Sequence, residues 1–153
     1  MSIVLRPTED SDVPSLAKLR ALEWETESYW IPRLSAYLSG EHSPRQALPY
    51  RTSFVATHDG QVVGFVAGHL TRRYACDAEL EWINVLPSWR HQGIAGLLLA
   101  TMAGWFLAQN ARRVCVDVTP NNAVARAFYT KHGAVRLNPH WMVWHDIASV
   151  ANR

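Results

Sequence analysis

The sequence predicts an α/β fold built on a mixed β-sheet, and three observations support this. Strand-like runs alternate with helical patterns along most of the chain. Two of the strand-like runs meet at Asp59-Gly60, a pair that favours a tight hairpin turn and therefore antiparallel pairing. Later runs follow a strand–helix–strand order, and such crossovers join parallel strands.

Length and composition indicate one globular domain that spans residues 1–153, long enough to bury roughly two thirds of its unfolded surface. The net charge of +2 is small and no run alternates basic with aromatic residues, which argues against nucleic acid as a partner. The N-terminus lacks the basic start and apolar core of a signal peptide. Cys76, Cys115 and the seven histidines show no metal spacing. We therefore expect free thiols, no metal site and a cytoplasmic location.

The first half of the chain is expected to form, in order, a strand at 2–7, a helix at 8–28, a helix around 30–38, a loop at 39–52 and a hairpin at 53–70. Asp12 is the expected N-cap of the first helix, because Pro14 suits the first helical turn. The loop is indicated by Gly40, Pro44 and Pro49.

The second half is expected to form, in order, a strand at 78–86, a helix at 93–109, a strand at 112–119, a helix at 121–132 and a last strand at 140–147. Pro87 and Pro120 end the first two of these strands, and Gly133 ends the last helix. No internal repeat, linker or low-complexity segment interrupts this order.

The run from Gly93 to Ala108 has no charged residue, and a membrane span, a buried helix or a phosphate-binding helix start would each have this pattern. Its 16 residues make a helix of about 24 Å, shorter than the roughly 20 residues that a bilayer needs. A buried helix explains the leucines but not Gly93 and Gly96 in the first turn, where each glycine costs about 1 kcal/mol. The free N–H groups of a helix start bind phosphate. Phosphate binding and simple packing both stay open.

The residues around this helix start form a motif, Arg90-x-x-Gly93-x-Ala95, just after Val85 and Pro87 close a strand. Neither a P-loop nor a dinucleotide-binding fingerprint is present. The motif resembles the Arg/Gln-x-x-Gly-x-Gly/Ala signature of the GNAT superfamily of N-acetyltransferases.

A second motif strengthens this resemblance. The family pattern Asn-x-x-Ala-x-x-Phe-Tyr-x-Lys-x-Gly is matched by Asn122, Ala125, Phe128, Tyr129, Lys131 and Gly133. The opening strand and helix are also similar, so the resemblance covers essentially the whole chain. Ala134, where the family usually has an aromatic residue, is a minor departure. The resemblance implies a mixed, mostly antiparallel sheet that is splayed at its centre and has helices on both faces.

The resemblance implies acetyl-CoA as the cofactor. The backbone N–H groups of residues 92–96 would hold the pyrophosphate, and Arg90 would contact the phosphates or simply hold the turn. The strand at 83–85 would pair with the pantetheine arm, because a splayed sheet leaves backbone groups that need a partner. The implied cofactor-binding residues are Ile83, Asn84, Val85, Arg90, His91, Gln92, Gly93, Ile94, Ala95, Gly96, Asn122, Ala125 and Phe128.

Tyr129 is the implied general acid, because acetyl transfer from a thioester expels a thiolate that needs a proton. On pattern alone Tyr129 could equally be a packing residue, since it follows Ala125 and Phe128 at helical spacing. Asn122 could cap its helix, contact the cofactor, or do both.

A base is also required, because an ammonium group does not attack a thioester. Glu79 and Glu81 are the candidates, since they lie two residues apart on one strand and therefore on one face. A solvated strand face is the competing interpretation. The bulge that is usual in the family at this strand would change the facing rule locally.

The acceptor is the least specified part of the reaction. The first two helices wall the acceptor site in relatives, and the aromatic candidates there and in the last strand are Trp24, Tyr29, Trp30, Tyr37, Trp141 and Trp144. An aromatic cleft suits a hydrophobic or cationic amine, although most of these rings could be ordinary core residues. We expect direct acetyl transfer, in a ternary complex, to the primary amine of a small molecule. A protein N-terminus or lysine, a non-catalytic acyl-CoA-binding module, and a homodimer stay open.

Overall fold

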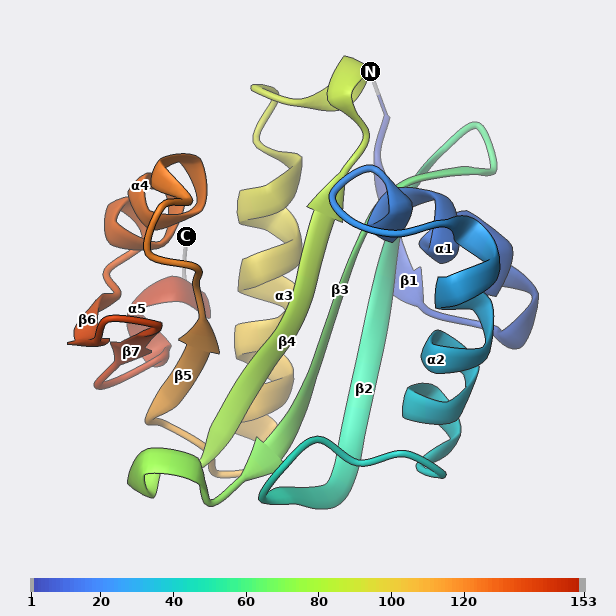
Figure 1. Cartoon of the computed structure of the whole chain (residues 1–153). Coiled ribbons are helices and arrows are strands. Elements are labelled where there is room, and N and C mark those ends of the chain that lie inside the picture. Colours follow the sequence, from blue (N-terminus) through green and yellow to red (C-terminus); the bar gives the residue numbers. More distant parts are fainter. Residues whose placement is uncertain (1, 152–153) are drawn as a thin grey trace.

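The computed structural model describes residues 2–151 and shows a seven-stranded sheet with helices on both faces (Figure 1). The strands are β1 (Val4–Pro7), β2 (Ala47–His58), β3 (Gln61–Thr71), β4 (Ala78–Val85), β5 (Val114–Asp117), β6 (Val135–Asn138) and β7 (Trp141–Trp144). The helices are α1 (Val13–Ala21), α2 (Glu27–Ser39), α3 (Ile94–Ala108), α4 (Ala123–Lys131) and α5 (Ala148–Ala151).

The sheet has the strand order β1-β2-β3-β4-β5-β7-β6, and every neighbouring pair is antiparallel except β4 and β5. These two parallel strands pair only where residues 78–80 face residues 114–116. Beyond Leu80, β4 continues to Val85 without a partner on that edge among the described residues. The mixed sheet that the sequence predicts, splayed at its centre, is therefore confirmed (Figure 1).

Two apolar clusters hold the helices against the sheet. On one face, Leu16 of α1 and Leu34 of α2 pack with Phe65 of β3. On the other face, α3 buries Leu98 and Met102 with the inward side chains of β3 and β4. Because each face of the sheet has its own apolar set, α1 and α2 lie opposite α3 (Figure 1).

The hairpin and the uncharged helix form as expected. Asp59 and Gly60 have φ values of 49° and 80°, the left-handed geometry that a two-residue hairpin turn requires. The uncharged run becomes α3, and no helix within residues 2–151 combines the length and apolarity needed to cross a membrane. Burial against the sheet explains Leu98, Leu99 and Phe106, whereas Leu97, which we also expected to be buried, is 46% exposed because it lies on the outer side of the helix.

The segment 39–52 is only partly the loop that we expected, because β2 already begins at Ala47. β1 pairs with β2 only over residues 54–57, so the earlier part of β2 has one free edge. A free edge tolerates Pro49, which has no N–H to donate. Arg51 adds side-chain hydrogen bonds to the carbonyl groups of Tyr37 and His42, which hold the preceding loop against α2.

The first helix is shorter than expected, since α1 ends at Ala21 and α2 begins at Glu27. Between them the chain turns through Glu25, which has a left-handed φ of 66°. Asp12 occupies the N-cap position, but its side chain makes no cap hydrogen bond to α1. Its carboxylate instead accepts hydrogen bonds from the Glu9 N–H and from Arg6.

The C-terminal region contains two strands where we expected one, because β6 and β7 form a hairpin around Pro139 and His140. β6 is an edge strand whose Val135 and Arg136 are exposed, so its sequence has no apolar alternation to reveal it. The short helix α5 was also not expected.

Candidate active site

A bulge in β4 brings two glutamates and a tryptophan to the face covered by α2. Gly68 of β3 pairs with Leu80 and the preceding Ala67 pairs with Trp82, which leaves Glu81 as the extra residue on β4. Glu79 lies opposite His69 on the same face of the sheet. In a regular strand, Glu81 and the next residue, Trp82, would point to opposite faces. The bulge lets Glu79, Glu81 and Trp82 share one face.

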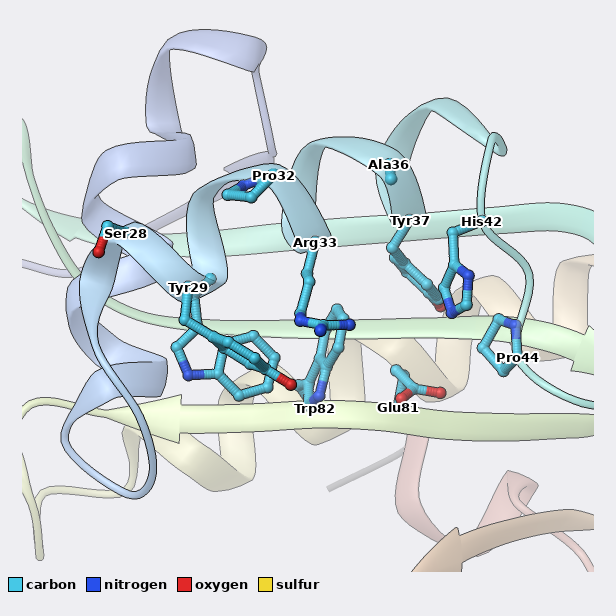
Figure 2. A pocket seen from close by; sticks show the side chains of 11 residues that line it. Ser28, Tyr29, Pro32, Arg33, Ala36, Tyr37, His42, Pro44, Glu81 and Trp82 are labelled. Atoms are coloured by element: carbon cyan, nitrogen blue, oxygen red, sulfur yellow. The ribbon is translucent and has the colours of Figure 1, made fainter.

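An open groove of about 680 Å³ lies between α2 and β4 (Figure 2). Its lining residues are Ser28, Tyr29, Trp30, Pro32, Arg33, Ala36, Tyr37, His42, Pro44, Glu81 and Trp82. Trp82 packs edge-on against Trp30 and Tyr37, with ring centroids 5.8 and 4.9 Å apart. Among these described lining residues, Glu81 is the one acidic residue, so the groove has aromatic walls and one carboxyl group.

A buried polar network lies behind Glu81. The Tyr37 hydroxyl and Nδ1 of His69 are hydrogen bonded at 2.9 Å, and His69 has no exposed surface. Nε2 of His69 lies 3.6 Å from the Glu79 carboxylate, which also accepts a 3.2 Å hydrogen bond from Nε of Arg73. Glu79 is therefore an inward-facing carboxylate that is already paired.

Glu81 differs from Glu79 in its access to the groove. The pKa of Glu81 is raised to about 8, first by burial and then by the charge and hydrogen bond of Glu79. A carboxyl group with a pKa near neutrality exchanges protons readily at physiological pH. Of the two predicted glutamates, only Glu81 lines the groove, and its pKa lies near neutrality.

His69, Glu79 and Glu81 also place three potential ligand atoms within 4.8 Å of one another. These are donor types that bind transition metals. However, the guanidinium group of Arg73 already supplies the positive charge beside Glu79. The network is balanced by Arg73 together with a proton on Glu81, which explains how two carboxylates lie so close.

Tyr129 lies in α4 and its side chain is buried, with its ring perpendicular to that of Trp144 at 5.7 Å. The packing role considered for Tyr129 is therefore real. Its hydroxyl makes no hydrogen bond to any residue in 2–151. Burial, and then the charge of Glu23, raise the pKa of the phenol, so Tyr129 is protonated at neutral pH and has a proton to donate.

The turn before α3 has the geometry of an anion-binding site. Gly93 is the N-cap residue and has a left-handed φ of 81°, and His91 has one of 63°. The N–H groups of residues 92–96 have no acceptor among the described residues. Nε of Arg90 donates a 3.2 Å hydrogen bond to the Val85 carbonyl, so Arg90 holds the turn in place.

The second sequence motif forms α4. Oδ1 of Asn122 accepts a 3.1 Å hydrogen bond from the Ala125 N–H, which confirms Asn122 as the cap of α4. Phe128 packs on the ring of His132 at 4.7 Å. His132, just after α4, lies 3.4 Å from the point where a Cβ atom on Gly96 would be, so the C-terminal end of α4 lies against the first turn of α3.

The remaining predicted residues lie around these sites. Ile83 and Val85 direct their side chains toward the α3 cluster. Trp24 lines a second cavity of about 540 Å³ rather than the groove, together with Arg20, Glu23, Thr119 and Asn122. Trp141 also does not line the groove, because it packs beneath the guanidinium group of Arg73 at 4.7 Å.

Sequence reasoning missed Arg20, His69 and Arg73. Arg20 lies on the apolar stripe of α1, four residues after Leu16, and this position could have indicated a buried charge. His69 and Arg73 gave no such signal, since they come to Glu79 only through the pairing of β3 with β4.

Comparison with known proteins agrees with this architecture. Residues 16–134 match the model of the "Acetyltransferase (GNAT) family". The match covers most of the chain, which therefore belongs to the acetyltransferase (GNAT) family. Membership implies acetyl-CoA as the acetyl donor.

An aminoglycoside N(6')-acetyltransferase type 1 from Salmonella typhimurium is 32% identical over 87 residues, which are 53% of this chain and 60% of that protein. The PaiA N-acetyltransferase of Thermoplasma acidophilum, solved with coenzyme A, has a TM-score of 0.70 at 18% identity and covers 94% of this chain and 98% of its own. A putative GNAT acetyltransferase of Desulfovibrio desulfuricans has a TM-score of 0.74 at 15% identity, with coverage of 95% and 99%. These structures show a shared fold.

Proposed function

We propose that the protein is an acetyl-CoA-dependent N-acetyltransferase that transfers the acetyl group directly to the primary amine of a small molecule. The observation that carries this proposal is the position of Glu81. Its carboxyl group lines the aromatic groove. Glu81 belongs to β4, and the edge of β4 that faces β5 is unpaired beyond Leu80. One strand therefore separates an amine site from a thioester site.

The residues around the opening fit acetyl-CoA, which supplies an acetyl group activated as a thioester. The free N–H groups of residues 92–96 would bind the pyrophosphate, because a helix start attracts anions. The unpaired edge of β4 near Ile83 would bind the pantetheine amides. His91 and Gln92, both exposed in the turn, and Asn122, Ala125 and Phe128 of α4 would border the same molecule.

Two side chains would move the protons of the reaction. Glu81 would take a proton from the bound ammonium group, and its raised pKa matches this task near neutral pH. Tyr129 would give its phenol proton to the leaving sulfur, since its hydroxyl is protonated and has no competing hydrogen bond among the described residues. Glu79 would hold Glu81 at its high pKa.

The groove supports a small amine with apolar or aromatic surface as the acceptor. Its walls are aromatic, and an ammonium group is attracted to ring faces and to Glu81 when that residue is ionised. The similarity to an aminoglycoside acetyltransferase also favours a small-molecule amine. Arg33, whose guanidinium group stacks on Tyr29 at 4.1 Å, makes the groove less suited to an acceptor with many positive charges.

The proposal is tested by a screen of small aromatic and aliphatic amines, aminoglycosides and peptides, with thiol release from acetyl-CoA as the readout. We expect a small monoamine to accelerate thiol release and to gain one acetyl group by mass spectrometry. Preferred acetylation of peptides would show a protein acceptor instead. Tight acetyl-CoA binding without turnover on any amine would identify a non-catalytic binding module.

We also propose that the protein acts in a reducing cytoplasm. Cys76 and Cys115 are both buried and carry free thiols, and they pack with Trp141 and Val143 in a small apolar cluster. Free thiols are usual in a reducing compartment. Alkylation of both cysteines in the unfolded protein, without any reductant, would support this location.

A further inference from the structure

Arg20, at the end of α1, lies where the aromatic groove meets the second cavity. Its guanidinium group is 4.6 Å from the ring centroid of Trp30 and 5.6 Å from that of Trp82, and both rings line the groove. Arg20 itself lines the second cavity together with Asn122 of the α4 motif. Arg20 therefore lies between the groove proposed for the amine and the cavity next to the proposed cofactor residue Asn122.

This arginine is buried and incompletely paired. Only 14% of its side-chain surface is exposed. Nη1 donates hydrogen bonds to Oδ1 of Asn84 at 3.0 Å and to the Glu23 carboxylate at 3.4 Å, and half of the Glu23 side chain is exposed. Nε is buried and has no partner among residues 2–151. A buried guanidinium group with an unused donor is suited to bind an electron-rich group of a ligand.

The charge of Arg20 acts on both of the proposed proton-transfer groups. It lowers the pKa of the Tyr129 phenol against the larger effect of burial. It also opposes the upward shift in the pKa of Glu81. Burial lowers the pKa of Arg20 itself, and the negative charges of Glu23 and Glu81 partly restore it. The guanidinium group thus lies within electrostatic reach of both proposed proton-transfer groups.

We propose that Arg20 stabilises the negative charge that develops on the sulfur of the leaving thiol. This inference rests on the proposed acetyl transfer. In that step the amine nitrogen forms a bond to the acetyl carbon, the carbon–sulfur bond breaks, and its electron pair goes to sulfur. Glu81, after passing the ammonium proton to solvent through the open groove, takes the second proton of the attacking nitrogen. The Tyr129 proton goes to sulfur, and solvent later returns a proton to the phenolate. Until the Tyr129 proton reaches sulfur, a fixed cation in a desolvated cavity stabilises the thiolate.

The test measures ionisation of the thiol of bound coenzyme A by its ultraviolet absorbance, with desulfo-coenzyme A as the reference for tyrosine ionisation. If Arg20 stabilises the thiolate, Arg20→Gln raises the pH at which the bound thiol ionises by about 1–3 units. Arg20→Lys, which keeps the charge, shifts it less. Arg113→Gln is the matched control, because Arg113 is also partly buried with an unpartnered Nε but lies at the closed end of β5.

The same variants separate a role in charge stabilisation from a structural one. Arg20→Gln should lower kcat by about 10²–10³-fold while acetyl-CoA affinity changes little. The loss should be much smaller when Tyr129 is already phenylalanine, because both residues act on the same developing charge. Equal losses in both backgrounds, or an unchanged thiol titration, would overturn the proposal.

Glu23→Gln provides an independent arm should Arg20→Gln fail to fold, since Glu23 is half exposed. Removal of its carboxylate leaves the Arg20 charge less neutralised, so the bound thiol should ionise at a lower pH than in the wild type. No shift, or a shift to higher pH, contradicts the role of Arg20. Wild-type protein that does not bind coenzyme A would instead refute the proposed function itself.

Discussion

Glu81 has a pKa of about 8 because it is buried and because Glu79 lies beside it. Replacement of Glu79 by glutamine removes the neighbouring charge and releases Arg73, and both changes favour ionised Glu81. We therefore expect the rise of kcat/KM with pH, centred near 8 in the wild type, to move to lower pH in Glu79→Gln. The measurement is the pH–rate profile on the best amine.

Glu81→Gln serves as the companion variant. It should lose rate most where the amine is still protonated, and higher pH should partly restore the rate as the amine loses its proton without help. A full rate in both glutamine variants would mean that solvent or the substrate itself removes the proton.

The same residue predicts how stability depends on pH. A pKa raised from 4.5 to about 8 in the folded state means that the folded protein binds the proton more tightly than the unfolded chain. The free energy of unfolding that Glu81 contributes is complete below pH 4.5 and is lost as pH rises to about 8. Urea unfolding across this range should show wild type weakening relative to Glu81→Gln. A constant difference between the two proteins would contradict the assigned pKa.

Tyr129 has a separate prediction, because its hydroxyl is needed only for proton donation. Tyr129→Phe keeps the ring against Trp144 and should leave stability and acetyl-CoA affinity nearly unchanged. The rate should fall by about 10²–10⁴-fold, the usual contribution of a placed general acid. High pH should not rescue it. A full rate in this variant would remove Tyr129 from the mechanism.

Among the structural elements, the turn that begins α3 has the most direct link to function. Gly93→Val places a branched side chain where φ is 81° and should remove the rise in melting temperature that acetyl-CoA causes. Gly60→Val is the matched control, since Gly60 has a φ of 80° and equally open space but lies in the β2–β3 hairpin. The control should lose stability and keep the acetyl-CoA response. A normal response in Gly93→Val would place the phosphates elsewhere.

The sequence predicted those elements whose signals are local. The Asp59-Gly60 turn, the apolar run of α3 and the cap of α4 each depend on neighbouring residues. The start of β2 and the edge strand β6 depend on distant pairing partners, and they were missed. The site divides in the same way. Motif residues were found from sequence, whereas the contacts of Arg20 and His69 with β4 arise only when separate elements pack together.

In the whole molecule, β4 lies between the two proposed sites. The groove lined by α2 and β4 lies on one face of the sheet. Along one edge of β4, the strand separates from β5 beyond Leu80 (Figure 1). The bulge at Glu81 and the unpaired stretch beyond Leu80 follow each other along this strand. The proposed direct transfer requires such an arrangement, because the amine and the thioester would have to meet at β4 without the acetyl group being held covalently by the protein.

Direct transfer is tested by the initial rate of thiol release measured as a function of both acetyl-CoA and the best amine. We predict almost no release without amine and intersecting reciprocal plots, because both substrates must be bound together. Parallel plots, with an acetylated protein detected by mass spectrometry when the amine is omitted, would contradict the account.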